Sequence, residues 1–273
     1  MVGQMIAKQV DVREDIAAAD ISMWQEALCA VEALLLRAAP VYWGLGAPRG
    51  DGSAVIVIPG FLGTDLYLME MYAWLRRMGY SSYFSGIGLN AECPNLLIRT
   101  RLNQTMDRAI RETGGRKIHL IGHSLGGVIA RSIAGQRSAE VASVITLGSP
   151  FRGTVVHKNV LKAASMVREK ILRQHGTGVL PECYTGACSC NFLARLRREL
   201  PEDMGQTAIY TRSDGVVDWH YCITGDESID FEVPGTHIGL VFNPGVYSIV
   251  AKRLWQARVN SAAPGHTAAG SKR

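Results

Sequence analysis

Long apolar runs are missing from this 273-residue sequence. No window approaches the roughly 20 consecutive apolar residues that a membrane helix requires, so we expect no integral membrane segment. The first 20 residues carry acidic side chains and lack a long apolar stretch followed by a small-residue cleavage site, which does not fit a secretory signal. We therefore expect the protein to be cytoplasmic.

Concentrated positive charge and cysteine are also scarce. The formal charge is only +5 and Lys and Arg are spread along the chain, so we expect no nucleic-acid partner. Six cysteines are too few for a disulfide-built scaffold of this length. Cys183, Cys188 and Cys190 do cluster, with Cys222 further along, and three interpretations stay open: free thiols, a disulfide to Cys222, or a metal site of uncommon spacing. The sequence does not indicate an oligomeric state.

The composition that is present, 47% apolar and 19% charged, is typical of a globular protein with one large core. Residues 22–38 predict an amphipathic helix that ends before Pro40. Its apolar stripe consists of Trp24, Leu28, Val31, Leu35 and Ala38. We expect residues 1–53 to form a helical segment packed on the core; a membrane-surface or dimer role is less favoured because the polar face is not basic.

Strands and helices then alternate along the chain. Predicted strands cover residues 54–58, 117–121 and 141–150, and residues 80–88 predict a further strand with its exit loop. Predicted helices cover 65–78, 95–113 and 127–134. The sheet resumes near Thr207, and the last helix is predicted at 246–259. This order predicts an α/β fold, a mostly parallel central sheet with helices on both faces, over residues 54–260, followed by a flexible tail at 261–273.

The alternation is interrupted at residues 151–206, which we interpret as a helical cap inserted between two strands. Helical spacing appears at 155–172 and again at 191–200. The first of these segments has one apolar stripe, formed by Val156, Val160, Ala164, Val167 and Ile171. Two interpretations stay open: the stripe shields a binding pocket as a lid, or it packs on the core as an ordinary helix.

A serine lies at a strand-to-helix junction in the pentapeptide Gly122-His123-Ser124-Leu125-Gly126. The pattern Gly-x-Ser-x-Gly arises by chance, but here a predicted strand precedes it and a predicted helix follows it. That setting forces a sharp turn that lifts the serine oxygen clear of the sheet. The start of the helix also supplies N–H groups and a positive dipole where negative charge develops during acyl transfer.

The chain at this point resembles the α/β-hydrolase superfamily, in particular its small bacterial lipase and esterase branch, over most of residues 54–255. The resemblance implies that the loop from Pro59 to Gly63 forms half of an oxyanion hole, with the N–H groups of Phe61 and Leu125 as donors. Without the serine motif downstream, Pro59-Gly60 would be read as a simple turn at the end of a strand.

In this fold the acid and the histidine follow the serine in the chain. Asp214 lies directly after a predicted strand, where the resemblance places the acid, and Asp218 is the alternative four residues later. His237 lies in Gly-Thr-His-Ile-Gly-Leu, which resembles the histidine segment of small bacterial lipases. Less favoured acids and histidines are Asp226, Glu227, Asp230, His119, His123, His157, His175, His220 and His266.

The resemblance implies a serine hydrolase acting on carboxylic esters through an acyl-enzyme, with Ser124, Asp214 and His237 as the triad and no metal or organic cofactor. An acyltransferase using the same triad is the nearest alternative, and a non-catalytic binding module is the next. The substrate is expected to be a small-molecule or lipid ester. Its pocket is expected to be lined by the cap and by Thr64, Asp65, Leu66 and Tyr67.

Overall fold

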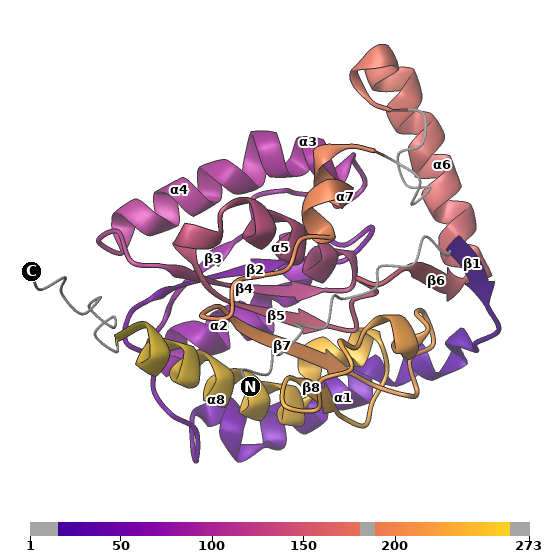
Figure 1. Cartoon of the computed structure of the whole chain (residues 1–273). Helices are drawn as coiled ribbons and strands as arrows, with labels where there is room; N and C mark the ends of the chain where they lie inside the picture. The colour runs from indigo at the N-terminus through magenta and orange to yellow at the C-terminus, as the bar shows by residue number, and fades with distance from the viewer. Residues whose placement is uncertain (1–15, 181–188, 263–273) are drawn as a thin grey trace, which may run out of the picture.

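A computed structural model describes residues 16–180 and 189–262. Its centre is a six-stranded sheet in the order β3-β2-β4-β5-β7-β8, in which every neighbouring pair is parallel (Figure 1). The strands are β2 (Ala54–Ile58), β3 (Ser81–Phe84), β4 (Ile118–His123), β5 (Val141–Leu147), β7 (Gly205–Tyr210) and β8 (Asp230–Glu232). The predicted α/β class is therefore confirmed.

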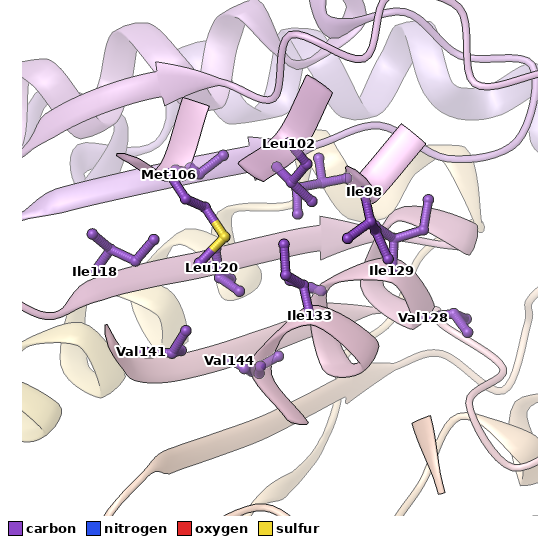
Figure 2. Packing of buried hydrophobic residues seen from close by; sticks show 14 of the residues in the cluster. Ile98, Leu102, Met106, Ile118, Leu120, Val128, Ile129, Ile133, Val141 and Val144 are labelled. Atoms are coloured by element: carbon purple, nitrogen blue, oxygen red, sulfur yellow. The ribbon is translucent and has the colours of Figure 1, made fainter. Parts of the chain in front are cut away.

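Helices cover both faces of this sheet, because successive side chains of each buried strand point in opposite directions. One face packs against α4 (Asn103–Glu112), α5 (Leu125–Gln136) and α7 (Asn191–Leu196). Figure 2 shows Leu120 and Val144 of the strands on this face, against Ile129 and Ile133 of α5. The other face packs against α2 (Met69–Met78) and α8 (Pro244–Ala262).

The predicted helix at 95–113 is longer and less regular than its pattern suggested. It begins at Pro94 as α3 (Pro94–Leu97), widens into one π turn, η4 (Ile98–Leu102), and continues as α4. Similarly, the predicted helix at 65–78 opens with a 3-10 turn, η3 (Asp65–Leu68), before α2, which ends at Gly79 with φ 97°. The short edge strand β8 had no recognisable signal in the sequence.

The N-terminal segment turns its apolar stripe outward. It comprises η1 (Met23–Leu28), α1 (Cys29–Ala38) and η2 (Pro40–Trp43). Trp24 is 68% exposed and Leu35 57% exposed, whereas Glu26 is buried. The helix lies where residues 22–38 predicted it, but the predicted stripe does not face the domain. Two carboxylates of the segment face the domain instead and accept hydrogen bonds from its loops. The reason is that backbone N–H groups of those loops require acceptors at this surface.

Residues 151–206 contain a strand that the sequence did not reveal. This strand, β6 (Thr154–His157), pairs in parallel with β1 (Ile16–Ala19) in a separate two-stranded sheet. The long helix α6 (Lys158–His175) follows. Near its start Val160 packs with Val217, and near its end Ile171 packs with Cys93, which lies just before α3. The helix therefore spans from the loop after β7 to the start of α3 (Figure 1).

The predictions about the cysteines, membrane-spanning helices and the C-terminal tail have different outcomes. Cys222 and Cys190 are free thiols, so the disulfide to Cys222 is wrong, while Cys183 and Cys188 lie outside the described residues. Within residues 16–180 and 189–262, no helix has the length and apolar character needed to cross a bilayer. Of the tail predicted at 261–273, residues 261 and 262 still belong to α8, and residues 263–273 lie outside the described residues.

Candidate active site

Ser124 occupies a strained turn between β4 and α5. Its φ of 53° and ψ of −126° lie in a region that non-glycine residues avoid, at a cost of about 1 to 3 kcal/mol. The Ser124 N–H donates to the Leu147 carbonyl of β5 at 2.8 Å, which holds the turn in place. A Cβ on Gly126 would lie 2.2 Å from the Ile58 carbonyl oxygen, so the turn packs against β2 too closely for any side chain there.

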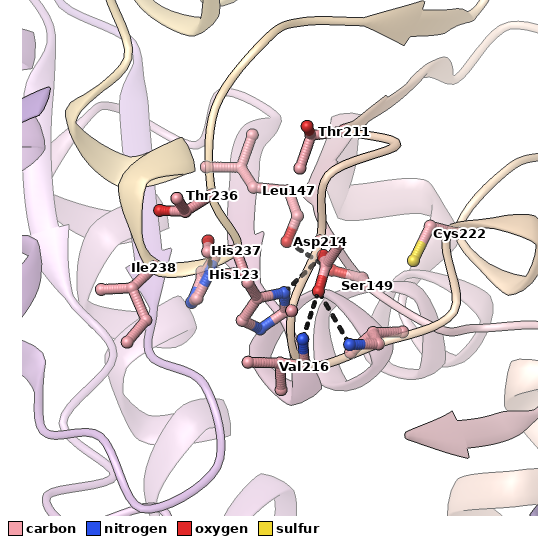
Figure 3. A network of polar contacts seen from close by, with 12 residues as sticks. His123, Leu147, Ser149, Thr211, Asp214, Val216, Cys222, Thr236, His237 and Ile238 are labelled. Atoms are coloured by element: carbon pink, nitrogen blue, oxygen red, sulfur yellow. Dashed lines mark hydrogen bonds and ion pairs between the residues drawn. The ribbon is translucent and has the colours of Figure 1, made fainter. Parts of the chain in front are cut away.

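Asp214 and His237 meet at the same end of the sheet. Asp214 follows β7 and His237 follows β8, and the two are joined by a hydrogen bond of 2.6 Å between Asp214 Oδ2 and His237 Nδ1 (Figure 3). The other carboxylate oxygen, Oδ1, accepts from the N–H groups of Val216 at 2.9 Å and Val217 at 2.7 Å. The backbone therefore fixes the carboxylate so that one oxygen faces the histidine.

The surroundings of His237 favour its protonated form. Burial lowers the pKa of His237, but the charge of Asp214, the hydrogen bond to Asp214 and the charge of Glu26 raise it, and the net result is a pKa above the usual 6.5. An imidazole in this place is stabilised once it has accepted a proton. That is the property required of a base that removes a proton from a serine hydroxyl.

His123 links the serine turn to the histidine loop and to the loop after β2. Its Nε2 lies 2.9 Å from the His237 carbonyl oxygen, which can only accept, so Nε2 carries the proton. Its Nδ1 then accepts from the Tyr67 hydroxyl at 2.7 Å, and that hydroxyl accepts from the Gly60 N–H at 2.9 Å. Burial, together with the charge of His237, lowers the pKa of His123 to about 3, which keeps this ring neutral.

The loop after β2 passes beside the nucleophile. A Cβ on Gly60 would lie 3.0 Å from Ser124 Cβ. Leu62 has a positive φ of 59°, and its N–H donates to the Asn90 carbonyl at 2.9 Å. Phe61 therefore sits between two anchored N–H groups, those of Gly60 and Leu62. Its predicted partner in the oxyanion hole, Leu125, is the first residue of α5, where N–H groups lack acceptors within the helix.

Comparison with known proteins shows which families and structures this chain is similar to. A family model described as a PGAP1-like alpha/beta domain matches residues 84–177. Triacylglycerol lipases from Pseudarthrobacter phenanthrenivorans and Burkholderia plantarii are each 31% identical over 113 residues, 37% of this chain and 34% and 30% of theirs. A solved structure of a soluble variant of monoglyceride lipase from Saccharomyces cerevisiae is 14% identical, with a TM-score of 0.51 over 77% of this chain and 90% of that one. The architecture of this chain is that of the α/β-hydrolase fold. It spans about a third of the length of the curated relatives it matches.

The predicted substrate residues have different surroundings. The Asp65 carboxylate accepts from the Ser85 N–H and hydroxyl and from the Gly86 N–H, so it holds the loop after β3. Tyr67 belongs to the hydrogen-bonded chain through His123. Leu66 is 68% exposed, and Thr64 precedes the first turn of η3. Of these four residues, only the Tyr67 side chain makes a hydrogen bond to a residue next to Ser124.

The alternative acids make contacts elsewhere. Asp218 Oδ1 contacts His220 Nδ1 at 2.6 Å on the surface. Asp230 accepts from the N–H groups of Thr224 and Gly225 and closes a turn. Asp214 is the carboxylate that the structure places against the His237 ring.

Most of the remaining histidines have local partners. His119 Nδ1 lies 2.8 Å from Ser143 Oγ between β4 and β5, and burial lowers the pKa of His119 to about 4. His157 accepts from the Asn159 N–H, and His175 pairs with Glu92. His266 lies outside the described residues.

Sequence reasoning missed two carboxylates of the N-terminal segment that bond the histidine loop, Glu26 and Glu32. Glu32 accepts from the Thr236 N–H at 2.9 Å and from the Thr236 hydroxyl at 2.7 Å. Both carboxylates lie on the polar side of an amphipathic helix, where a glutamate normally signals solvent. The role of Tyr67 in joining Gly60 to His123 had no signal either, because it depends on three segments that are far apart in the chain.

Proposed function

We propose that this α/β-hydrolase cleaves carboxylic esters with Ser124 as nucleophile, His237 as general base and Asp214 as the acid that orients the histidine. The observation that carries the proposal is the 2.6 Å hydrogen bond between Asp214 and His237 at the end of the sheet where the strained Ser124 turn lies. A serine hydroxyl is a weak nucleophile unless a neighbouring base removes its proton, and such a base requires an orienting carboxylate.

The reaction follows from the proton positions. With Nδ1–H donated to Asp214, the His237 Nε2 lone pair is free to take the proton of Ser124 as its oxygen attacks the ester carbonyl carbon. The C–O bond to the alcohol then breaks, and His237 returns the proton to the leaving alkoxide. Water, deprotonated by the same nitrogen, hydrolyses the acyl-enzyme and regenerates Ser124.

The developing oxyanion would be bound by the N–H groups of Phe61 and Leu125. In support, Phe61 lies on a loop anchored on both sides, and Leu125 begins a helix whose positive dipole end faces the nucleophile. Donors fixed before the reaction stabilise a transition state without reorganisation at the moment of bond formation. The Tyr67–His123 chain supports this rigidity, because it fixes the loop to the serine turn.

The proposed substrate is a small-molecule or lipid ester with an apolar acyl chain. Leu62 and Leu66 on the loop and turn after β2, and Ile238 next to the histidine, expose apolar surface near the site. The relatives named triacylglycerol lipases favour hydrolysis of esters over acyl transfer. In this proposal α6 covers the site as a cap. The cytoplasmic location stays a prediction. It is supported by the free cysteines among the described residues, because proteins of reducing compartments keep their thiols reduced.

The test uses p-nitrophenyl esters of increasing acyl chain length. We expect the wild type to hydrolyse them, and Ser124→Ala to lose at least about three orders of magnitude in kcat while keeping its melting temperature. A fluorophosphonate probe should label the wild type and not this variant. A Ser124→Ala protein that keeps a tenth of the activity would contradict the proposed nucleophile.

A further inference from the structure

Glu26 joins the two loops that carry the proposed acid and base. Its Oε1 accepts from the N–H groups of Gly215 at 3.0 Å and His237 at 2.9 Å, and its Oε2 accepts from the Ile238 N–H at 2.8 Å. Gly215 directly follows Asp214 in the chain. One buried carboxylate of the N-terminal segment therefore contacts the residue after the acid, the base itself and the residue after the base.

The contact is closely fitted on both sides. A Cβ on Gly215 would lie 2.9 Å from Glu26 Oε1 and 2.7 Å from the Ser22 carbonyl oxygen, so only glycine lets the acid loop approach this segment. All three partners of Glu26 are N–H donors, and only an ionised carboxylate offers two oxygens that both accept. An amide of the same size has one acceptor oxygen, and its NH₂ group would face at least one of these donors.

We propose that Glu26 is a positioning residue that clamps the acid loop to the histidine loop and so holds His237 in register with Asp214 and Ser124. This inference rests on the proposed function, because register matters only if the three residues act together. A displacement of about 1 Å in a catalytic group can lower the rate by about 100-fold.

The charge of Glu26 acts on the same histidine. Among the described residues, three ionisable groups face His237: Asp214 from the acid loop, His123 from β4 and Glu26 from η1. Burial lowers the pKa of His237, while the charge of Asp214, its hydrogen bond and the charge of Glu26 raise it. Removing the Glu26 charge should therefore lower the pKa of His237. Since the neutral imidazole is the active base, the acidic limb of the kcat/KM profile should move to lower pH.

The decisive variant is Glu26→Gln, with Glu32→Gln as its matched control. Glu32 lies on the adjoining helix α1 and bonds the same histidine loop, but only through Thr236. A glutamine at 32 keeps both bonds, because the Thr236 hydroxyl can accept from the amide instead of donating to it. We expect Glu26→Gln to lower kcat about 10- to 100-fold with KM nearly unchanged, and to move the acidic limb to lower pH. Glu32→Gln should leave both at the wild-type value.

A second variant and a second measurement keep the proposal testable if Glu26→Gln does not fold. Glu26→Asp keeps the charge but withdraws the oxygens by one methylene, so kcat should fall while the acidic limb stays in place. NMR titration of the His237 ring in Ser124→Ala and in Ser124→Ala/Glu26→Gln needs no catalysis, and the second protein should titrate at lower pH. An inactive wild type would refute the proposed function and leave this titration informative. Unchanged kcat in Glu26→Asp, an unmoved titration, or equal effects of Glu26→Gln and Glu32→Gln would overturn the inference.

Discussion

Replacing Asp214 with Asn tests the proposed triad through a proton position. Asp214 Oδ1 accepts from two backbone N–H groups, so the carbonyl oxygen of an asparagine must take that place. Its NH₂ group then points at His237 Nδ1, where the carboxylate oxygen stood. Two donors cannot face each other, and Nδ1 must give up its proton and accept. The imidazole is thereby forced into the tautomer with its proton on Nε2.

The magnitude follows from the loss of the base. With Nε2 protonated, His237 has no lone pair directed at Ser124, and attack on the ester must proceed without general-base assistance. Substitutions that hold the catalytic histidine of a serine hydrolase in the wrong tautomer lower kcat by about 10³- to 10⁴-fold. At about 1.4 kcal/mol for each factor of ten, that corresponds to about 4 to 5.5 kcal/mol of lost transition-state stabilisation.

Steady-state hydrolysis of a short p-nitrophenyl ester measures this effect, with Asp218→Asn as the control. Asp218 lies four residues further and contacts His220 at the surface, so its amide variant should keep close to wild-type turnover. Melting temperatures of both variants should lie near that of the wild type, which separates catalysis from folding. Turnover of Asp214→Asn within tenfold of wild type, or the larger loss in Asp218→Asn, would refute the assignment.

Two further substitutions test the frame around the nucleophile. Tyr67→Phe removes the donor to His123 Nδ1 and the acceptor of the Gly60 N–H; at about 1 to 3 kcal/mol for each unpaired buried group, it should destabilise the fold by about 2 to 6 kcal/mol. Thermal denaturation measures this loss of stability. The control is Tyr72→Phe, which should keep the wild-type stability because the Tyr72 hydroxyl contacts an exposed arginine. Gly126→Ala should prevent folding, because its Cβ would lie 2.2 Å from a carbonyl oxygen of β2; a variant that expresses and melts like wild type would show that this turn has room for a side chain.

The sheet and the serine turn were predictable because their signals are local. Continuous apolar strands such as Ala54–Ile58 alternate with amphipathic helices, and that order admits few arrangements other than a parallel sheet. The Gly-x-Ser-x-Gly pattern needs only the strand before it and the helix after it. The pairing of Asp214 with His237 was predictable from chain order, since parallel strands bring their carboxyl ends to the same edge.

Other features depend on contacts between segments far apart in the chain, which no local pattern encodes. The four-residue pairing of β1 with β6 joins Ile16–Ala19 to Thr154–His157, and neither strand is long enough to give a clear period. Asp65 was predicted in the substrate pocket because it lies on a loop at the carboxyl end of a strand, and that stays a prediction. Its carboxylate holds the backbone of residues 85 and 86, a contact that depends on where the loop after β3 lies.

The orientation of the N-terminal helix is set by hydrogen bonds as well as by the hydrophobic pattern. Turning the stripe of Trp24, Leu28, Val31 and Leu35 inward would gain about 1.5 to 3 kcal/mol for each side chain fully buried. The same rotation would take Glu26 and Glu32 away from four backbone N–H groups and one hydroxyl, at about 1 to 3 kcal/mol for each donor left buried without an acceptor. The two terms are of similar size, so apolar burial alone does not decide the orientation. The loops around His237 expose their N–H groups because of the turn that presents the histidine, and a helix that supplies carboxylates to them leaves this stripe in solvent.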